Sequence, residues 1–305
     1  MNRRQFLARS SGATAALAIV PIPKLSPADI HLSCNLYTWY SYYNREGKDF
    51  YADMDAGLGQ VAASGMDGFE PSLTSVEQVD QMAPLMEKHG LEMRSIYVNS
   101  LLHERDAADE SIENVLKIVE KCKALGTKIV VTNPSPIGWD SPENKTDRQL
   151  RDQAVALQRL GSELYNMGVT LAYHTHDSEF RAGAREFHHM MISTNPRHVT
   201  FCLDVHWVYR GALNSNVALY DVIEMYGDRI SELHIRQSRD HIWSETFGEG
   251  DIDYAGVIEV LNRKNLKPML VFEQAAEEGT PHTMSPLEVH KQSQVEVRKI
   301  FAPLG

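Results

Sequence analysis

Short apolar runs alternate with longer amphipathic segments along the chain from residue 31 to the end. The runs are rich in Val, Ile, Leu, Phe and Tyr, which is typical of strands buried on both faces. They predict eight strands, at 31–37, 67–71, 92–98, 128–133, 169–176, 199–206, 230–236 and 268–273.

The segments between these runs have the periodicity of helices. In 109–125, for example, apolar residues recur at spacings of three and four, which gives one buried stripe. Glycines at 65, 90, 126 and 168 each end such a segment just before a strand, as a left-handed C-terminal cap requires. The predicted helices are 49–64, 75–89, 109–125, 146–167, 183–193, 216–227, 254–264 and 285–302.

This strict alternation predicts parallel strands joined by right-handed crossovers. Eight such units favour a closed (β/α)8 TIM barrel, and about 250 residues suffice for one barrel domain. An open, doubly wound sheet is the alternative. No glycine-rich nucleotide-binding motif follows an early strand, which argues against it. We therefore expect a single barrel domain over residues 29–305, with its chemistry at the carboxyl ends of the strands.

The first 28 residues differ from the rest in composition. Arg3 and Arg4 precede Gln-Phe-Leu and a stretch rich in Ala, Gly and Ser, which resembles a twin-arginine export signal. The stretch is too short and too weakly apolar for a stable membrane anchor. A frayed basic N-terminus is the alternative. The signal predicts a periplasmic protein.

Charge and cysteine content narrow the function classes further. The net charge is −11, so the chain repels phosphate backbones and we expect no nucleic-acid partner. Three cysteines in no CxxC spacing provide neither a disulfide framework nor a cysteine zinc site.

Polar residues stand at the carboxyl ends of six of the eight predicted strands. Residues two apart in a strand point to the same face, so neighbouring polar residues there act together. These strand-end residues are Glu70, Asn133, His174, His176, Asp204, His206, His234, Arg236 and Glu273.

Four of these residues predict a metal site. His174, Asp204, His234 and Glu273 belong to four consecutive strands and would converge near the barrel axis. Unpaired buried charges cost several kcal/mol or more, and a divalent cation would compensate them. Mixed nitrogen and oxygen ligands favour one Mn, Zn, Co or Fe ion over calcium. The alternative is ordinary hydrogen bonding, for example of each histidine singly or of Glu70 with Arg94.

The chain resembles the xylose isomerase-like TIM barrel superfamily, the sugar phosphate isomerase/epimerase family. That family also includes ketose 3-epimerases, inosose dehydratases and endonuclease IV-like barrels. The resemblance implies Asp204, His234 and Glu273 as metal ligands. The motifs that carry it are GMDGFEP at 65–71, LAYHTHDSEF at 171–180, FCLDVHW at 201–207, ELHIRQ at 232–237, FGEGDIDY at 247–254 and VFEQ at 271–274.

One position departs from the usual pattern of this family. The epimerases place a glutamate ligand on strand five, where this chain has His174. The sequence YHTHDSEF is close to the YHxHxxEF signature of a subgroup that carries this histidine. Either His174 replaces the usual ligand, or Glu179 supplies the missing carboxylate.

The resemblance implies metal-assisted proton abstraction next to the carbonyl of a sugar. Glu273 or His176 would accept the proton, and Glu70 is a further candidate catalytic residue. Return of the proton gives isomerisation or epimerisation, whereas loss of a β substituent gives elimination, as in a dehydratase or lyase. Residues expected to contact the substrate are Trp39, Asn133, His206, Trp207, Arg236 and Glu249.

Other functions stay open at this point. An endonuclease IV-like phosphodiesterase would need more metal ligands and a basic DNA-binding face. A sugar-binding barrel without catalysis is a third reading. Export and the lack of a glycine-rich phosphate cradle favour a free or glycosidic keto-sugar over a phosphosugar. A homo-oligomer is compatible with the family.

Overall fold

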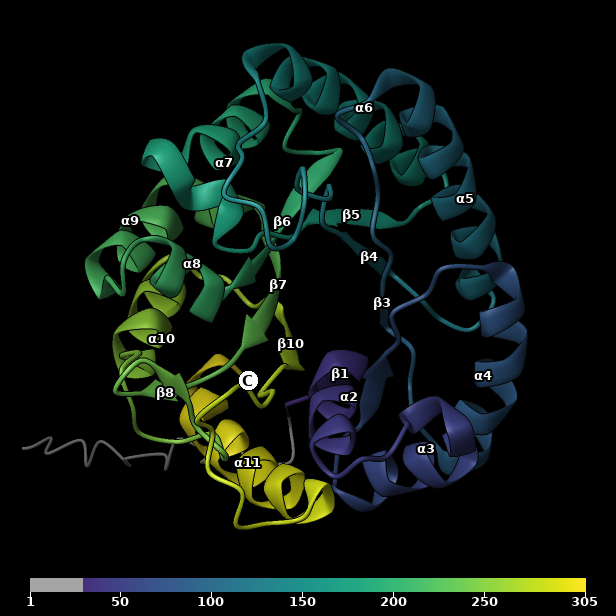
Figure 1. Ribbon diagram of the computed structural model, residues 1–305, viewed down its shortest axis with the longest axis vertical. Coiled ribbons are helices and arrows are strands. Elements are labelled where there is room, and N and C mark those ends of the chain that lie inside the picture. Colours follow the sequence, from purple (N-terminus) through teal and green to yellow (C-terminus); the bar gives the residue numbers. More distant parts are fainter. Residues whose placement is uncertain (1–29) are drawn as a thin grey trace, which may run out of the picture.

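Eight parallel strands line the centre of the computed structural model, which describes residues 30–305 (Figure 1). The predicted export signal, residues 1–28, lies outside the described residues. The barrel strands are β1 (Leu32–Asn35), β2 (Gly68–Glu70), β3 (Ser95–Tyr97), β4 (Ile129–Thr132), β5 (Thr170–Tyr173), β6 (Val199–Asp204), β7 (Ile230–Ile235) and β10 (Met269–Phe272).

The order of the strands closes the sheet into a barrel. β1 pairs in parallel with both β2 and β10, so the first and last barrel strands are neighbours. β2 and β3 are the ends of the sheet order, and they are linked by single bridges. The amide of Phe69 donates to the carbonyl of Glu92 at 2.9 Å, and the amide of Tyr97 donates to that of Pro71 at 2.9 Å. The predicted single (β/α)8 barrel is confirmed.

A ring of helices surrounds the strands (Figure 1). Each crossover helix covers the outside of the barrel and returns the chain to the start of the next strand. The helices are α2 (Leu36–Arg45), α3 (Met54–Ala63), α4 (Val76–His89), α5 (Arg105–Lys123), α6 (Asp147–Asn166), α7 (Arg181–Ser193), α8 (Val205–Gly211), α9 (Asn216–Tyr226), α10 (Tyr254–Arg263) and α11 (Pro286–Phe301).

Local sequence signals determine where several helices begin and end. The four glycines predicted as left-handed caps all have positive φ, from 68° at Gly90 to 96° at Gly126. α6 begins with a capping box in which the Thr146 hydroxyl accepts from the amide of Gln149 and the Gln149 side chain accepts in return. These signals lie in the sequence itself, which is why the helices were predictable.

Two helices and one hairpin were not predicted. α2 follows β1 directly, α8 follows β6 directly, and the strands β8 (Ser238–Arg239) and β9 (Ile242–Trp243) form a hairpin after β7. The predicted strands 31–37 and 199–206 were too long, because the first apolar residues of α2 and α8 continue the apolar run of each strand. β5 likewise ends at Tyr173, so His174 and His176 lie in the loop that follows it.

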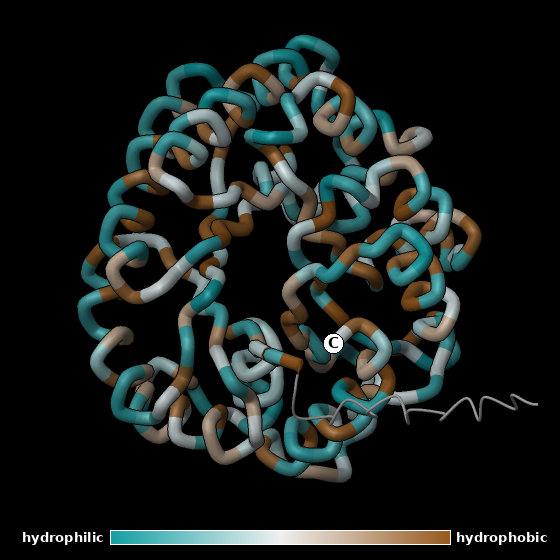
Figure 2. The backbone as a smooth tube through the Cα atoms, turned by 180° about the vertical axis from the view of Figure 1, so that it is seen from behind, coloured by the Kyte–Doolittle hydropathy of each residue, from teal (hydrophilic) through white to brown (hydrophobic). Residues whose placement is uncertain are grey.

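Apolar side chains fill the space between barrel and helices. Brown segments in Figure 2 gather around the central strands, and the surrounding helices alternate between brown and teal along their length. Leu32, Phe69, Phe201 and Phe272 from four different strands are fully buried there. Within residues 30–305, no helix is long and apolar enough to cross a membrane.

Candidate metal centre and active site

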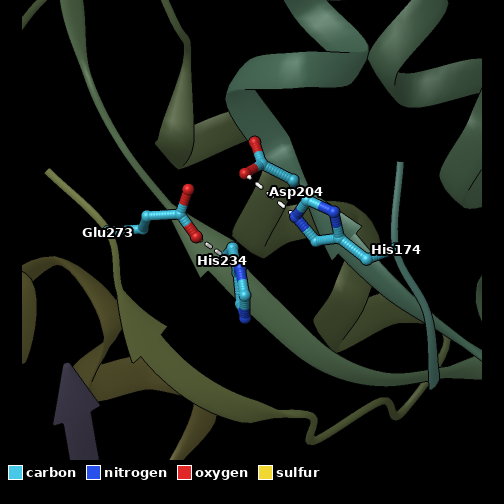
Figure 3. Close-up of side chains that lie close together, drawn as sticks. All are labelled: His174, Asp204, His234 and Glu273. Carbon is cyan, nitrogen blue, oxygen red and sulfur yellow. Dashed lines mark ion pairs between the residues drawn. The ribbon is translucent and has the colours of Figure 1, made fainter. Parts of the chain in front are cut away.

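Four side chains meet at the carboxyl end of the barrel (Figure 3). His174 follows β5, Asp204 ends β6, His234 lies in β7 and Glu273 follows β10. Each offers one ligand atom, and these atoms all lie within 4.8 Å of one another. All four side chains are buried. The structure therefore brings together the four residues predicted to bind a metal, which we call the metal cluster.

The donor atoms of the metal cluster suit a divalent cation. His174 Nε2 lies 3.5 Å from Asp204 Oδ2, and His234 Nδ1 lies 2.5 Å from Glu273 Oε2. Among the described residues, His174 Nε2 and Asp204 Oδ2 have no hydrogen-bond partner. Ligand atoms about 2.0–2.2 Å from a transition metal lie at most about 4.4 Å apart, close to the spacing here. Two imidazole nitrogens and two carboxylate oxygens fit Mn, Zn, Co or Fe.

Outer contacts hold two of these ligands in place. The Tyr97 hydroxyl lies 3.4 Å from His174 Nδ1, the ring nitrogen opposite the one that faces Asp204. The second oxygen of Asp204, Oδ1, accepts a 2.7 Å hydrogen bond from the amide of Trp207 in the first turn of α8. Each ligand therefore keeps one atom free for a cation while another is fixed by the fold.

Two side chains hold Glu273. Asn35 at the end of β1 donates to Oε2, and Arg236 at the end of β7 donates to Oε1. Arg236 Nε also donates to the backbone carbonyl of Glu273 at 2.8 Å. The Arg236 guanidinium lies 4.0 Å from the ring centre of Trp243, a cation–π distance that fixes it further.

Burial and neighbouring charges set the protonation of the site. Burial lowers the pKa of both His174 and His176 to about 3, so both imidazoles are neutral at pH 7. Burial, followed by the charge of Glu273, raises the pKa of Asp204 to about 6. A bound cation would accept the lone pair of the neutral His174 imidazole and would stabilise the ionised form of the Asp204 carboxylate.

In Glu273 and His234, neighbouring charges outweigh the effect of burial on the pKa. Burial alone would raise the pKa of Glu273, but the charges of His234 and Arg236 outweigh it and lower that pKa. Burial would lower the pKa of His234, but Cys202, Glu70 and Glu273 raise it well above the usual value. In the metal-free protein His234 thus carries the positive charge that compensates the surrounding acids.

A cavity of about 450 Å³ opens beside the metal cluster. Glu273 and His176 line it, so both predicted proton acceptors reach the space where a substrate would bind. The predicted contact residue Trp207 lines it as well. The remaining walls are rich in aromatic and polar side chains: Asn35, Tyr37, Ser72, Tyr97, Asn99, Pro136, Trp139, Asp177, Ser178 and Arg181.

Several predicted residues lie behind the cavity wall. Asn133 is fully buried, and its amide donates to the carbonyl of His174 and to Glu179, both at 3.1 Å. His206 is fully buried between Trp207 and Trp243. Arg236 is also fully buried, and it acts on the cavity through Glu273. These three residues shape the site from outside the cavity lining.

Two residues predicted to contact the substrate lie outside the cavity lining. Trp39 is fully buried in the core, where its ring stacks on His290 at 3.9 Å and its indole nitrogen donates to Cys34 Sγ. It lies on the unpredicted helix α2, whose inner side packs on the barrel rather than on the cavity. Glu249 is exposed and lines a separate hollow of about 470 Å³ beside the β8–β9 hairpin.

Two further candidate glutamates, Glu70 and Glu179, also lie outside the cavity lining. Glu70 is fully buried below the metal cluster, outside the cavity lining, and its Oε1 lies 3.3 Å from His234 Nε2. Its alternative partner Arg94 pairs with Glu92 instead. Glu179 accepts from the amide of His176 at 2.7 Å and from Asn133, so it supports the loop after β5 and supplies no ligand to the cluster.

Ten lining residues were missed by the sequence reasoning, and four of them show why. Asn35 and Tyr97 end β1 and β3, so the strand-end rule applied to all eight strands would have found them. Trp139 lies in the long loop after β4, which the sequence did mark as a place for chemistry. Tyr37 lies on α2, an element with no signal separate from the apolar run of β1.

Fold and site together define a (β/α)8 barrel with a two-histidine, two-carboxylate cluster beside an aromatic cavity. The sequence profile of the xylose isomerase-like TIM barrel family matches residues 58–294. The chain belongs to this family. The subgroup assignment and the export signal stay predictions.

Characterised relatives are distant in sequence. The chain is 25% identical over 199 residues to the inosose dehydratase of Geobacillus kaustophilus (strain HTA426), covering 61% of this chain and 62% of the relative's length. It is 22% identical over 260 residues to the inosose dehydratase of Clostridium perfringens (strain 13 / Type A), covering 76% and 84%.

Similar solved structures include several sugar epimerases. The 3-keto-D-glucoside 4-epimerase from E. coli has a TM-score of 0.67 at 13% identity, covering 88% of this chain and 99% of that one. The D-allulose 3-epimerase from Methylomonas sp. in complex with D-allulose has a TM-score of 0.68 at 14% identity, covering 88% and 96%. A xylose isomerase-like barrel from Mycobacterium smegmatis in complex with magnesium has a TM-score of 0.69 at 12% identity, covering 92% and 99%. At these identities the likeness shows the fold alone.

Proposed function

We propose that this protein is a divalent-metal-dependent enzyme that removes the proton next to the carbonyl of a sugar, as an isomerase or epimerase. One observation carries the proposal: Glu273 belongs to the metal cluster and also lines the aromatic cavity. A substrate in the cavity would therefore meet the cation and a proton acceptor together. The names of the relatives support a substrate with a carbonyl and several hydroxyls, since inosose and a 3-keto-glucoside are of this kind.

The metal cluster would hold the cation through its two histidines and two carboxylates. When bound, a divalent cation polarises a carbonyl and a neighbouring hydroxyl, which lowers the free energy of an enediolate. His174 is neutral at pH 7, so it is ready to donate its lone pair. Arg236 and Asn35 keep the Glu273 carboxylate aimed into the site.

Two groups in the cavity can accept the proton. Glu273 approaches from the end of β10 and is ionised at neutral pH, because its pKa is lowered by His234 and Arg236. His176 approaches from the loop after β5 and is neutral at that pH. Return of the abstracted proton to the neighbouring carbon by the same group gives isomerisation. Epimerisation needs the second group to deliver to the other face a proton taken up from solvent, while the first group releases its proton to solvent.

The aromatic walls suit a sugar ring. Tyr37, Trp139 and Trp207 present apolar ring surfaces, on which the C–H face of a sugar packs, while Asn35 and Arg181 offer hydrogen-bond donors. The net charge of −11 favours an uncharged sugar over a phosphosugar. We propose a free or glycosidic keto-sugar, encountered in the periplasm after twin-arginine export.

A dehydratase or lyase is the second candidate. Elimination starts from the same proton abstraction and differs in the group lost from the β carbon. The inosose dehydratases favour it, since this chain is similar to them in sequence. A sugar-binding barrel without catalysis is the third candidate. An endonuclease IV-like phosphodiesterase is disfavoured by the acidic charge of the chain.

Metal content and proton exchange test the proposal. The protein purified without added metal should contain about one equivalent of Mn, Zn, Co or Fe, and a Glu273→Gln, His234→Ala double variant should contain none. Keto-sugars incubated with the metal-loaded protein in D₂O should gain deuterium next to the carbonyl. Trp39→Phe, a conservative change in the core, is the matched control and should keep both properties. A parent protein that takes up no metal on titration overturns the proposal.

A further inference from the structure

A second group of polar side chains lies directly below the metal cluster. Glu70 on β2, Ser95 on β3, Cys202 on β6 and Glu232 on β7 are buried to 1% exposure or less, and none lines the cavity. Glu70 and Glu232 face Nε2 of His234, the ring nitrogen that points away from Glu273. We call Glu70 and Glu232 the inner acid pair.

The strand register explains this second layer. Glu232 and His234 are two apart in β7, so both point into the barrel, with Glu232 one layer deeper. Cys202 is the register partner of Glu232 on the neighbouring strand β6. The inner acid pair is thus part of the packed barrel interior, where a substrate in the cavity does not reach it.

Both members of the inner acid pair face one nitrogen. His234 Nε2 lies 3.1 Å from Glu232 Oε1, with which it forms a hydrogen bond, and 3.3 Å from Glu70 Oε1. Ser95 donates to the other oxygen of Glu70 at 2.9 Å, whereas the Cys202 thiol is 3.9 Å from Glu232 and a weak donor. A buried carboxyl oxygen is costly without a donor, and a proton on His234 Nε2 supplies one to Glu232 Oε1 and faces the unpartnered Oε1 of Glu70.

This proton determines which nitrogen of His234 binds a cation. An imidazole with its proton on Nε2 has its lone pair on Nδ1, the atom that faces Glu273. Carboxylates bonded to the outer nitrogen of a histidine ligand fix its tautomer and its ring orientation. We propose that the inner acid pair positions His234 as an Nδ1 ligand of the metal cluster, with Glu232 as the direct partner. The inference rests on the metal site of the proposed function.

The alternative is that a second cation binds the same atoms, which would give a different number of metal ions per chain. Cys202, Glu232 and His234 also have ligand atoms within 4.8 Å of one another. A second cation there would take Nε2 of His234 and displace its proton, so it excludes the positioning role. Positioning predicts one bound metal ion per chain, and the rival predicts two.

Metal affinity of purified full-length variants tests the inference. Glu232→Met keeps the approximate volume and removes the acceptor, so the dissociation constant for Co²⁺ or Zn²⁺, measured by calorimetry, should rise about 10–100-fold. Glu232→Gln keeps an acceptor oxygen and should restore much of the affinity. Cys202→Ser, at the register partner of Glu232, is the matched control and should stay within about twofold of the parent, as expected for a neighbour that is a weak donor.

Two further measurements separate positioning from general damage. In a His234→Ala background, Glu232→Met should change the affinity by less than about twofold, because the residue through which it acts is gone. In the zinc-loaded protein with ¹⁵N-labelled histidine, the parent should show a proton on Nε2 of His234 and none on Nδ1. If Glu232→Met does not fold, Glu232→Leu, which also removes the acceptor, takes its place in the comparison with Glu232→Gln.

The outcomes distinguish this inference from the proposed function. One equivalent of metal in the parent with unchanged affinity in Glu232→Met overturns the inference and leaves the metal site standing. Two equivalents, or a proton on Nδ1, also overturn it. No metal in the parent overturns the proposed function, and this inference with it.

Discussion

Arg236 contacts Glu273 at two points. Its side chain forms an ion pair with Oε1, and its Nε donates a 2.8 Å hydrogen bond to the backbone carbonyl. The two residues end adjacent strands, β7 and β10, which pair in parallel up to Phe272. A single guanidinium thus contacts both the backbone and the carboxylate of Glu273. The charge of that guanidinium also lowers the pKa of Glu273.

Replacement of Arg236 should therefore change the pH profile as well as the rate. In Arg236→Met the Glu273 carboxylate loses a neighbouring positive charge, so its pKa rises. The acidic limb of kcat/KM should move to higher pH, and kcat/KM at pH 7 should fall about 10–100-fold, roughly 1.4–2.7 kcal/mol. Arg239→Met, on the exposed hairpin, is the control with an unchanged profile. An unmoved acidic limb in Arg236→Met would show that the ionisation of Glu273 does not govern the rate.

Metal binding should weaken as the pH falls. The pKa of Asp204 is raised to about 6 in the metal-free protein, so protons compete for this ligand below that pH. Affinity should drop roughly tenfold per pH unit from one such proton below pH 6. His174, with a pKa of about 3, adds no competition between pH 5 and 7. Calorimetric titrations at pH 5, 6 and 7 measure this, and a flat affinity would contradict it.

Protonation of His234 should make metal binding depend on pH above neutrality as well. Its pKa is raised well above the usual value by Cys202, Glu70 and Glu273, so the metal-free side chain is protonated at pH 7. A cation at Nδ1 must displace one proton, so metal binding at pH 7 should release about one proton per ion. Titrations in buffers of different ionisation enthalpy count that proton. In His234→Gln the release should vanish along with most of the affinity.

The rim of the cavity should govern substrate affinity. Trp139 is 55% exposed, and its ring meets His176 edge-on at 4.9 Å. Trp139→Ala should raise KM about 3–30-fold, as expected for about 0.5–2 kcal/mol of lost ring contact, with little change in kcat. Tyr51→Ala, another exposed aromatic residue outside the cavity lining, is the control. An unchanged KM in Trp139→Ala would remove this loop from the substrate site.

Replacement of Trp39, in contrast to that of Trp139, should lower the stability of the fold and leave KM unchanged. Its fully buried ring stacks on His290, so Trp39→Ala should lower the free energy of unfolding by about 3–5 kcal/mol, measured in urea. Metal-loaded Trp39→Phe should keep the KM of the parent, because the ring does not line the cavity. A large rise in KM in this conservative variant would return Trp39 to the substrate site.

The sequence predicted the barrel because its signals are local and repeated. Each strand is a short apolar run, and the glycine caps at Gly65, Gly90, Gly126 and Gly168 separate helices from the strands that follow. The same logic failed where two apolar elements adjoin without a break, as at β1 and α2 or β6 and α8. Periodicity over so few residues does not separate the end of a strand from the first turn of a helix.

The site was predictable in part for a related reason. In a barrel the carboxyl ends of the strands converge, so His174, Asp204, His234 and Glu273 could be brought together from their positions alone. Depth along the barrel axis could not be judged in this way. Glu70 lies one layer below the cavity and Trp39 lies on the barrel side of an unpredicted helix, and both facts depend on tertiary packing.

Asp204 serves folding and chemistry with one side chain. Its Oδ1 caps the first turn of α8, while Oδ2 is free for a cation. An alanine here removes a helix cap worth about 1 kcal/mol as well as a ligand, whereas an asparagine preserves the cap and removes the charge. The residues tolerated at this position are therefore limited by two independent requirements, and a comparison of Asp204→Asn with Asp204→Ala separates the cost to the helix from the cost to the metal.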